Sequence, residues 1–380
     1  MQEEFERYRL KIRDFVEQVL EPMAVQVEED GKIPESLVEQ MRSLGLFGLS
    51  IPRIYGGLGL TTLEEVMIYE QLTRTNACYR SRIGTSNGIG SMGILFDGTD
   101  EQKTTFLPPV AAGRYTAAFA LTEADAGSDA ANIRTTAVLD GNDWILNGTK
   151  QFITNADTAT IFTTLAVTDE EKRSRGGVTA FIVEKGMPGF SIGAGDVKMG
   201  LRGSHTHELI FKHCRVPKEN VIGGMDMVGQ GFKTAMRVLD KGRLAIGGAA
   251  LGASQKVLEL CVDRVKQMIK SKIPVQDLQA IQFDLADMAT QIYAARQMLY
   301  HTAKLKDQGE NVTQKASMVK VFCTEMASHI ADKALDIFSQ EGCLTQNRIE
   351  TFLRDVRLYR IYEGTSEIQR IIISRDLLHE

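Results

Sequence analysis

The spacing of apolar residues changes twice along this 380-residue chain, and that change limits its fold more than any other feature. Over the first 114 residues, apolar positions recur at steps of three and four, the period of one buried helix face. The first such stripe consists of Phe5, Tyr8, Ile12, Phe15, Val16 and Val19. A second helix is expected between Pro34 and Gly45, since proline favours a first turn and glycine a helix end. Residues 1–114 therefore predict an N-terminal all-α domain.

Between residues 115 and 227 the apolar residues instead form short β-rich runs. These runs are Tyr115–Leu121, Ile133–Leu139, Thr160–Val167, Val178–Val183 and Glu208–Phe211. The turn residues that separate them are Asp140-Gly141-Asn142, Asn147-Gly148 and Pro188-Gly189. Short strands at this spacing, without helical patterns between them, predict a central antiparallel β barrel or sandwich domain.

From residue 228 to residue 380 the pattern is helical again. One long stripe consists of Ile281, Leu285, Met288, Ile292, Ala295 and Leu299, and a second runs from Met318 to Ile337. Steps of four and three are typical of a bundle seam. The chain is therefore predicted to be an α+β multidomain protein with a C-terminal α-helical bundle. Long helices with such seams often pack against a partner subunit.

Charge and cysteine content exclude several classes of function. The net charge of -5 argues against nucleic acid or an anionic membrane as the main partner. No apolar run reaches the roughly 18 residues that a transmembrane helix needs. The charged N-terminal residues match neither a signal peptide nor a transit peptide. Five scattered cysteines without a Cys-x-x-Cys pair indicate free thiols in a reducing compartment, so the cytoplasm is expected.

One stretch near the C-terminus, residues 360–370, places a carboxylate in a setting suited to general-base chemistry. A carboxylate held partly out of water is disfavoured in its charged form, so Glu363 would be a better base near neutral pH. Gly364 has no side chain, so a substrate could approach the backbone closely there. Thr365 can cap the helix that follows. The alternative is a helix start that happens to carry an acidic residue.

Two further stretches offer groups that could hold a planar ring system. In Phe119–Asp129 a strand runs into a turn, where backbone amides and the hydroxyls of Thr122 and Ser128 can form hydrogen bonds. In the second stretch, Phe152 and Thr154 lie on one face of an extended segment. A ring could stack on the phenylalanine while the hydroxyl binds one of its nitrogens. The alternatives are a plain acidic turn and a cross-strand Phe–Thr pair.

The order of these motifs closely resembles that of the acyl-CoA dehydrogenase family. The matching segments are Leu121-Thr122-Glu123 with Gly127-Ser128-Asp129, then Phe152-Ile153-Thr154-Asn155, then Leu239-Asp240 with Arg243, then Tyr362-Glu363-Gly364-Thr365. The resemblance covers essentially the whole chain, with four separate motifs in the family's order. It implies the family's fold, in agreement with the α–β–α order described above, and a homotetramer.

By this resemblance, the protein is expected to hold FAD and to dehydrogenate an acyl-CoA thioester to a trans-2-enoyl-CoA. Glu363 matches the base that takes the α-proton, while the β-hydride passes to flavin N5. The backbone N–H of Glu363 would help to polarise the thioester carbonyl. Some members carry the base on a helix instead, and the matching position is Gly242, which has no side chain. Electrons would pass on to an electron-transfer flavoprotein.

The resemblance also assigns binding residues. FAD contacts fall on Phe119, Ala120, Leu121, Thr122, Gly127, Ser128, Phe152, Ile153, Thr154, Thr365 and Glu367. Substrate contacts fall on Ser128, Asp240, Arg243 and Gly364, with Ser128 serving either FAD or the phosphate region of CoA. No metal is expected, because a metal site needs more ligands than His205, His207 and His213 clearly offer, and a solvated strand fits them better.

Two segments depart from the family pattern. Met268–Lys272 stands where relatives have Arg-x-x-Phe-Gly, and Asp336–Gln340 lacks the glutamine and the glycine pair of relatives. In the family these segments bind the ADP half of a neighbouring subunit's FAD, so those contacts are expected to differ. A non-catalytic protein that binds acyl-CoA or FAD is one alternative, although the intact Glu363 argues against it. An oxidase that reduces oxygen directly is another.

The acyl group of the substrate stays open at this stage. Tyr79-Arg80-Ser81 resembles glutaryl-CoA dehydrogenases, where the matching arginine pairs with the distal carboxylate of the substrate. A buried arginine needs an anionic partner, so Arg80 could mark a dicarboxyl-CoA substrate. The alternative is a structural ion pair with a protein carboxylate such as Asp97.

Overall fold

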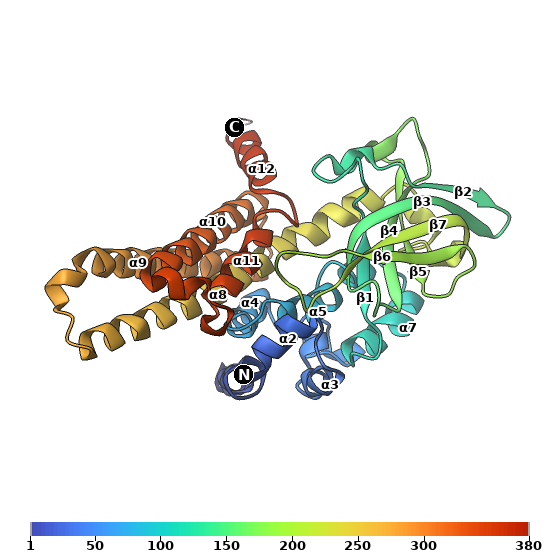
Figure 1. Ribbon diagram of the computed structural model, residues 1–380. Coiled ribbons are helices and arrows are strands. Elements are labelled where there is room, and N and C mark those ends of the chain that lie inside the picture. Colours follow the sequence, from blue (N-terminus) through green and yellow to red (C-terminus); the bar gives the residue numbers. More distant parts are fainter. Residues whose placement is uncertain (1, 379–380) are drawn as a thin grey trace.

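Helices form both ends of the chain and a sheet forms its middle in the computed structural model, which describes residues 2–378 (Figure 1). The N-terminal helices are α1 (Gln2–Phe15), α2 (Ala24–Asp30), α3 (Glu35–Ser43), α4 (Thr62–Leu72), α5 (Cys78–Asn87), α6 (Met92–Asp97) and α7 (Asp100–Ala111). Their stripes meet in one core, to which α1 gives Ile12 and α3 gives Met41. The predicted all-α character of this part is confirmed.

The middle of the chain forms one seven-stranded sheet. Its strands are β1 (Ala117–Ala120), β2 (Thr136–Asp140), β3 (Asp143–Thr154), β4 (Ile161–Val167), β5 (Val178–Glu184), β6 (Phe190–Gly195) and β7 (Thr206–Pro217). The order is β1-β4-β2-β3-β7-β6, with β5 on β4. Most neighbours are antiparallel, as predicted, but β1 and β2 both run parallel to β4.

The apolar pattern of the sequence did not predict two of the strands, β3 and β6. Asn147-Gly148 was expected to be a turn, but it forms a bulge inside β3, where the pairing with β7 shifts register. Gly148 serves close packing there, since a Cβ would lie 2.5 Å from the Thr135 hydroxyl oxygen. The second strand, β6, is short and rich in glycine and small residues, so it carries little alternation.

Strand β4 is buried on both faces along its whole length, and the hydroxyls of its two threonines, Thr163 and Thr164, donate to Gly90 O and Phe162 O. On one face Ile161 and Leu165 share a core with side chains of α6 and α7. On the other face Phe162 and Ala166 lie in a separate core within the β domain. The sheet is therefore packed directly against the N-terminal helices.

The C-terminal helices are α8 (Gly231–Lys270), α9 (Gln279–Asp307), α10 (Thr313–Phe338), α11 (Ile349–Tyr359) and α12 (Ser366–Leu378). Helix α8 is about 60 Å long at 1.5 Å per residue, and it runs from the β domain to the far end of the bundle (Figure 1). The predicted seam of α9 is buried from Met288 to Leu299. Helix α12 packs on α10.

Helix α11 ties the three parts of the chain together just before the Glu363 segment. The carboxylate of Asp355 accepts the N–H of Ala77 at 3.2 Å, at the start of α5. It also accepts the N–H of Leu201 at 2.6 Å, in the loop before β7. This buried staple fixes the C-terminal segment against both neighbouring domains.

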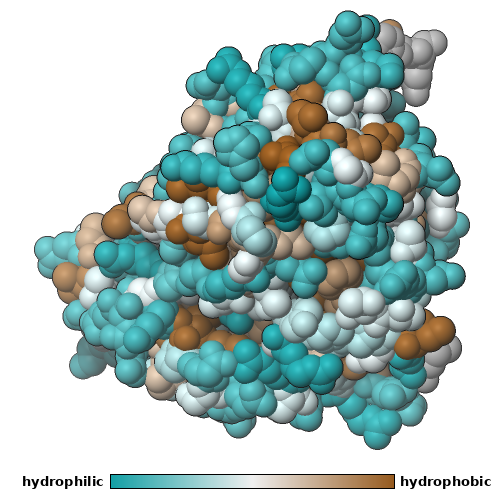
Figure 2. Space-filling view, turned by 90° about the vertical axis from the view of Figure 1, so that its right-hand side faces the viewer, coloured by the Kyte–Doolittle hydropathy of each residue, from teal (hydrophilic) through white to brown (hydrophobic). Residues whose placement is uncertain are grey.

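The outer surface is mostly hydrophilic, as expected for a chain in which 24% of the residues are charged. Figure 2 shows the side that carries the β domain, where hydrophobic residues form separate patches on a mostly hydrophilic face. Within residues 2–378, no helix combines the length and the apolar character needed to cross a membrane.

Candidate active site

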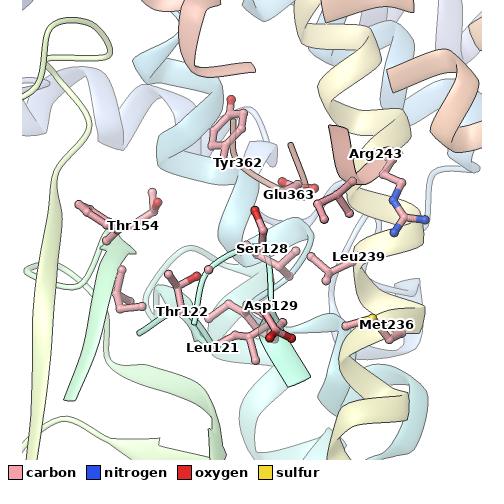
Figure 3. Close-up of a pocket in the computed structure, with 18 of the residues that line it drawn as sticks. Leu121, Thr122, Ser128, Asp129, Thr154, Met236, Leu239, Arg243, Tyr362 and Glu363 are labelled. Carbon is pink, nitrogen blue, oxygen red and sulfur yellow. The ribbon is translucent and has the colours of Figure 1, made fainter. Parts of the chain in front are cut away.

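A cavity of about 570 Å³ lies where the β domain, α5, α8 and the segment before α12 meet. Its volume is in the range of pockets that hold cofactors and small ligands. Figure 3 shows residues from these parts around it, with Thr122 and Ser128 from the β domain, Arg243 from α8, and Glu363. The predicted residues that line it are Arg80, Phe119, Leu121, Thr122, Gly127, Ser128, Phe152, Ile153, Thr154, Arg243, Glu363 and Gly364.

Glu363 and Gly364 form a left-handed turn between α11 and α12, with φ values of 54 and 88. The left-handed conformation costs a residue with a Cβ roughly 1–2 kcal/mol, so it needs outside support. Lys320 Nζ donates to Gly364 O at 2.7 Å. Gln369 Nε2 donates to the same oxygen at 3.0 Å and to Glu363 O at 3.2 Å. Two buried side chains therefore hold the turn.

The Glu363 carboxylate is removed from water without being neutralised by a direct partner. Oxygen Oε2 is buried and has no hydrogen-bond partner among the described residues. Burial raises the pKa of Glu363, and the positive charges of Arg80, Lys320 and Arg243 oppose that rise. A carboxylate with a raised pKa and a free oxygen can accept a proton from a bound substrate.

Arg80 lies on α5 with only 6% of its surface exposed. Its guanidinium stacks over the Tyr69 ring at 5.0 Å, and Gly84 leaves room for it one turn along the helix. The expected alternative partner is wrong, because Asp97 instead pairs with Arg237 at 2.6 Å. Within residues 2–378, Arg80 has no ion pair with a carboxylate, and the charge of Glu363 lies nearby.

Helix α8 supplies the wall beside Glu363. Met236, Leu239 and Arg243 line the cavity (Figure 3). Asp240 does not line it; its carboxylate instead accepts hydrogen bonds from Arg243 and from Thr313 Oγ1. The aspartate thus holds the arginine in place at the cavity wall.

The β domain supplies an open aromatic face. Phe152 is 61% exposed and has φ 56, although it follows a buried lysine within β3. An exposed ring at the wall of a cavity, next to the Thr154 hydroxyl, is suited to stacking on a planar cofactor. Gln151 N donates to Thr122 O at 2.9 Å and so joins the end of β1 to β3. The residues present therefore fit a flavin.

Three predicted FAD residues lie outside the cavity wall. Ala120 points into the β-domain core. Thr365 caps α12, where it accepts the N–H of Ile368 at 3.3 Å, and Glu367 is exposed. Their FAD contacts stay predictions.

Sequence reasoning missed a buried network behind this wall. Lys150 is fully buried and donates to Leu121 O at 3.1 Å and to Glu123 Oε1 at 2.7 Å. The same carboxylate oxygen accepts the N–H and the hydroxyl of Thr135. In the sequence, the only sign of this network is that one candidate stretch carries Glu123 and the other begins with Lys150. Ile371 and Ile372 of α12 also line the cavity and were not predicted to do so.

The histidine cluster and the two departing segments lie away from the cavity wall. Asp157, His205 and His207 bring ligand atoms within 4.8 Å of one another. Both ring nitrogens of His205 are engaged, with Asp157 Oδ2 at 2.6 Å and Gly31 O at 2.7 Å. In the second departing segment Ser339 keeps φ 54, a conformation that glycine adopts more easily.

Comparison with known proteins identifies the class that this fold and site define. Family models for the N-terminal, middle and C-terminal domains of acyl-CoA dehydrogenase match residues 2–114, 118–214 and 229–378. The chain is 40% identical to an acyl-CoA dehydrogenase of Bacillus subtilis, covering 97% of each chain. It therefore belongs to the acyl-CoA dehydrogenase family, whose members are FAD-dependent oxidoreductases.

Two solved structures are also similar to this chain. Butyryl-CoA dehydrogenase from Megasphaera elsdenii has a TM-score of 0.94 and 34% identity, with 98% of each chain covered. A glutaryl-coenzyme A dehydrogenase in complex with glutaryl-CoA has a TM-score of 0.92 and 30% identity, with 100% of this chain and 96% of that chain covered.

Proposed function

We propose that this protein removes hydrogen from the α and β carbons of an acyl-CoA thioester and yields the trans-2-enoyl-CoA. The observation that carries this proposal is the buried Oε2 of Glu363, which has no hydrogen-bond partner within residues 2–378 and lies at the wall of a cavity that fits a flavin. An α-proton of a thioester is weakly acidic, so its removal needs a positioned base in a water-poor site.

Different groups of the chain have separate roles in this dehydrogenation. The backbone N–H of Glu363 donates to the thioester carbonyl and stabilises the negative charge that develops on its oxygen. The α C–H bond breaks and its proton goes to the Glu363 carboxylate. The electron pair left on the α-carbon forms the new double bond as the β C–H pair leaves as hydride. FAD, when bound, supplies the acceptor for that hydride.

Phe152, Thr154 and the end of β1 would hold the flavin ring from the β-domain side. Arg243, oriented by Asp240, would contact the CoA portion. The missing side chain of Gly364 leaves room for Gln369, whose Nε2 would lie 2.5 Å from a Cβ at this position. By resemblance, the chain would work as a homotetramer and pass its electrons to an electron-transfer flavoprotein.

A narrower candidate is a dicarboxyl-CoA such as glutaryl-CoA. The observation that favours it is Arg80, a buried guanidinium at the cavity wall without a carboxylate partner in the described chain. A buried charge is costly unless an anion compensates it, and the distal carboxylate of the substrate would do so. The similar structures include both a butyryl-CoA and a glutaryl-CoA dehydrogenase, so this candidate depends on Arg80.

The test is an anaerobic titration of the flavin-loaded protein with butyryl-, octanoyl-, isobutyryl- and glutaryl-CoA. Loss of flavin absorbance is expected with at least one of them, and the best reductant names the acyl class. Glu363→Gln should bind FAD and acyl-CoA but lose at least about 100-fold in the rate of flavin reduction. Reduction of Glu363→Gln at the wild-type rate would refute the base assignment.

The substrate class has its own variant. Arg80→Met removes the guanidinium and keeps much of its volume. If the substrate is a dicarboxyl-CoA, the ratio of kcat/KM for glutaryl-CoA over butyryl-CoA should fall at least about ten-fold. Using the ratio cancels any general effect of Arg80 on Glu363. An unchanged ratio would assign Arg80 to the support of Glu363 alone.

A further inference from the structure

Lys320 is a buried lysine beneath the turn that carries the base. It lies on α10 with 0% of its surface exposed. Its Nζ donates to Gly364 O at 2.7 Å, and no carboxylate oxygen of residues 2–378 lies within 4.0 Å of it. A buried ammonium group with one neutral acceptor is poorly compensated, so it needs a nearby negative charge.

Among the carboxylates, Glu363 acts most strongly on the Lys320 ammonium group. The groups that act on the Lys320 ammonium are Glu363, then Arg243 with opposite effect, then Glu325 and Glu367. Glu325, on α10 itself, is paired with Arg360 and Arg370, and Glu367 is exposed on α12. Lys320 and Glu363 are therefore electrostatic partners, although no direct ion pair joins them.

The same lysine also fixes the shape of the turn. Gly364 O accepts hydrogen bonds from Lys320 and from Gln369, and both Glu363 and Gly364 are left-handed. That shape decides where the N–H and the carboxylate of Glu363 point. Gln369 supplies hydrogen bonds without charge, whereas Lys320 supplies a hydrogen bond and a positive charge.

We propose that Lys320 is a positioning residue for the base: it holds the Glu363–Gly364 turn through Gly364 O, and its ammonium group favours the charged form of the Glu363 carboxylate. This inference rests on the proposed role of Glu363 as the base. Burial lowers the pKa of Lys320 to about 8, so the group is largely protonated at pH 7. The other charged groups that act on Glu363 are Arg80 on α5 and Arg243 on α8, and its charge in turn acts on the buried hydroxyls of Tyr69 on α4 and of Tyr362.

The test compares Lys320→Met with Gln369→Met in the flavin-loaded protein. Both variants remove a donor to Gly364 O, but only the first removes a charge. The protonated carboxyl band of Glu363, assigned by its loss in Glu363→Gln, is followed by infrared difference spectroscopy as a function of pH. Lys320→Met should raise the titration midpoint by about one pH unit or more, because an opposite charge is lost. Gln369→Met should leave the midpoint unchanged.

The rate of flavin reduction by butyryl-CoA gives a second readout. Both variants should slow it, since both loosen the turn, but only Lys320→Met should shift its pH profile upward by the same amount as the infrared midpoint. Equal midpoints in the two variants would overturn the proposal and leave Lys320 as a structural donor only. If Lys320→Met does not fold, Lys320→Gln removes the same charge and is read in the same way.

Failure of the proposed function would look different. Glu363→Gln with wild-type flavin reduction would refute the base assignment, whatever the infrared midpoints show. An unshifted midpoint in Lys320→Met, with an inactive Glu363→Gln, would refute only the role of Lys320.

Discussion

The carboxylate of Glu363 occupies the space that a side chain at Gly242 would take. A Cβ built on Gly242 would lie 1.8 Å from Glu363 Oε2. Gly242 belongs to α8 and Glu363 to the turn before α12. Side chains from these two distant segments would therefore occupy the same part of the cavity wall. This explains in physical terms why a family could place its base at either position, since only one of the two can supply the carboxylate.

Gly242→Ala should therefore displace the base without unfolding the protein. The conflict is with the free end of a flexible side chain, so the carboxylate moves and the helix stays. A displacement of about 1 Å should lower the rate of flavin reduction roughly 100-fold. Stopped-flow reduction by the best acyl-CoA substrate measures this effect.

The control for this prediction is the same change in a Glu363→Gln background. If Gly242→Ala acts only through the carboxylate, it should cost little further once that carboxylate is gone. Additive losses in the double variant would show that Gly242 matters for another reason, such as the path of α8.

Gly84→Ala should weaken the role of Arg80 in choosing the acyl group. A Cβ at Gly84 would lie 3.2 Å from Arg80 Cζ, so the guanidinium has to shift by a few tenths of an ångström. For a dicarboxyl-CoA substrate, the glutaryl-to-butyryl ratio of kcat/KM should fall, but less than in Arg80→Met. A lower rate with both substrates and an unchanged ratio would contradict this prediction.

Lys150→Met should destabilise the wall that faces the flavin. The change leaves Glu123 buried without its cation, which typically costs about 3 kcal/mol or more in the free energy of unfolding. It also removes the hydrogen bond to Leu121 O at the end of β1. Urea unfolding should show the loss of stability, and FAD titration should show a weaker affinity. An unaltered affinity would separate this network from cofactor binding.

Local motifs led to the prediction of Glu363 as the base, which stays a prediction, whereas its surroundings depend on tertiary contacts. The carboxylate, the glycine and the helix cap are consecutive residues, Glu363, Gly364 and Thr365. Their proximity therefore followed from the sequence alone. Lys320 could not be assigned, because a single lysine in an apolar run fits both an exposed stripe and a buried partner. Its acceptor, Gly364 O, comes from a different segment, and only the packing of α10 beneath the turn joins them.

The same limit applies to the middle of the chain. Helices followed from apolar spacing, which is a local property. The bulge at Gly148 did not, because its reason is the closeness of Thr135 on a neighbouring segment. The partner of Arg80 was also wrongly expected, since Asp97 is close in sequence but is bound by Arg237 and Thr234.

The stability of the fold should depend on pH through Asp355. Burial raises its pKa to about 6, Glu28 adds to the rise, and the two backbone N–H donors and Arg354 oppose it. The pKa of an unfolded aspartate is near 3.9, so the folded state binds more protons between about pH 4 and pH 6. The contribution of Asp355 to stability is therefore most favourable at low pH and falls as pH rises through this window.

Asp355→Asn tests this prediction, because it removes the titration and keeps the shape. The difference in unfolding free energy between wild type and variant should change by about 2–3 kcal/mol from pH 4 to pH 7, with the wild type relatively more stable at pH 4. Asp332→Asn, at an exposed position on α10, is the matched control for the loss of an aspartate from the same helical domain. A constant difference for Asp355→Asn would contradict this prediction. It would mean that the Asp355 carboxylate stays charged in the folded protein without a raised pKa, which its burial disfavours.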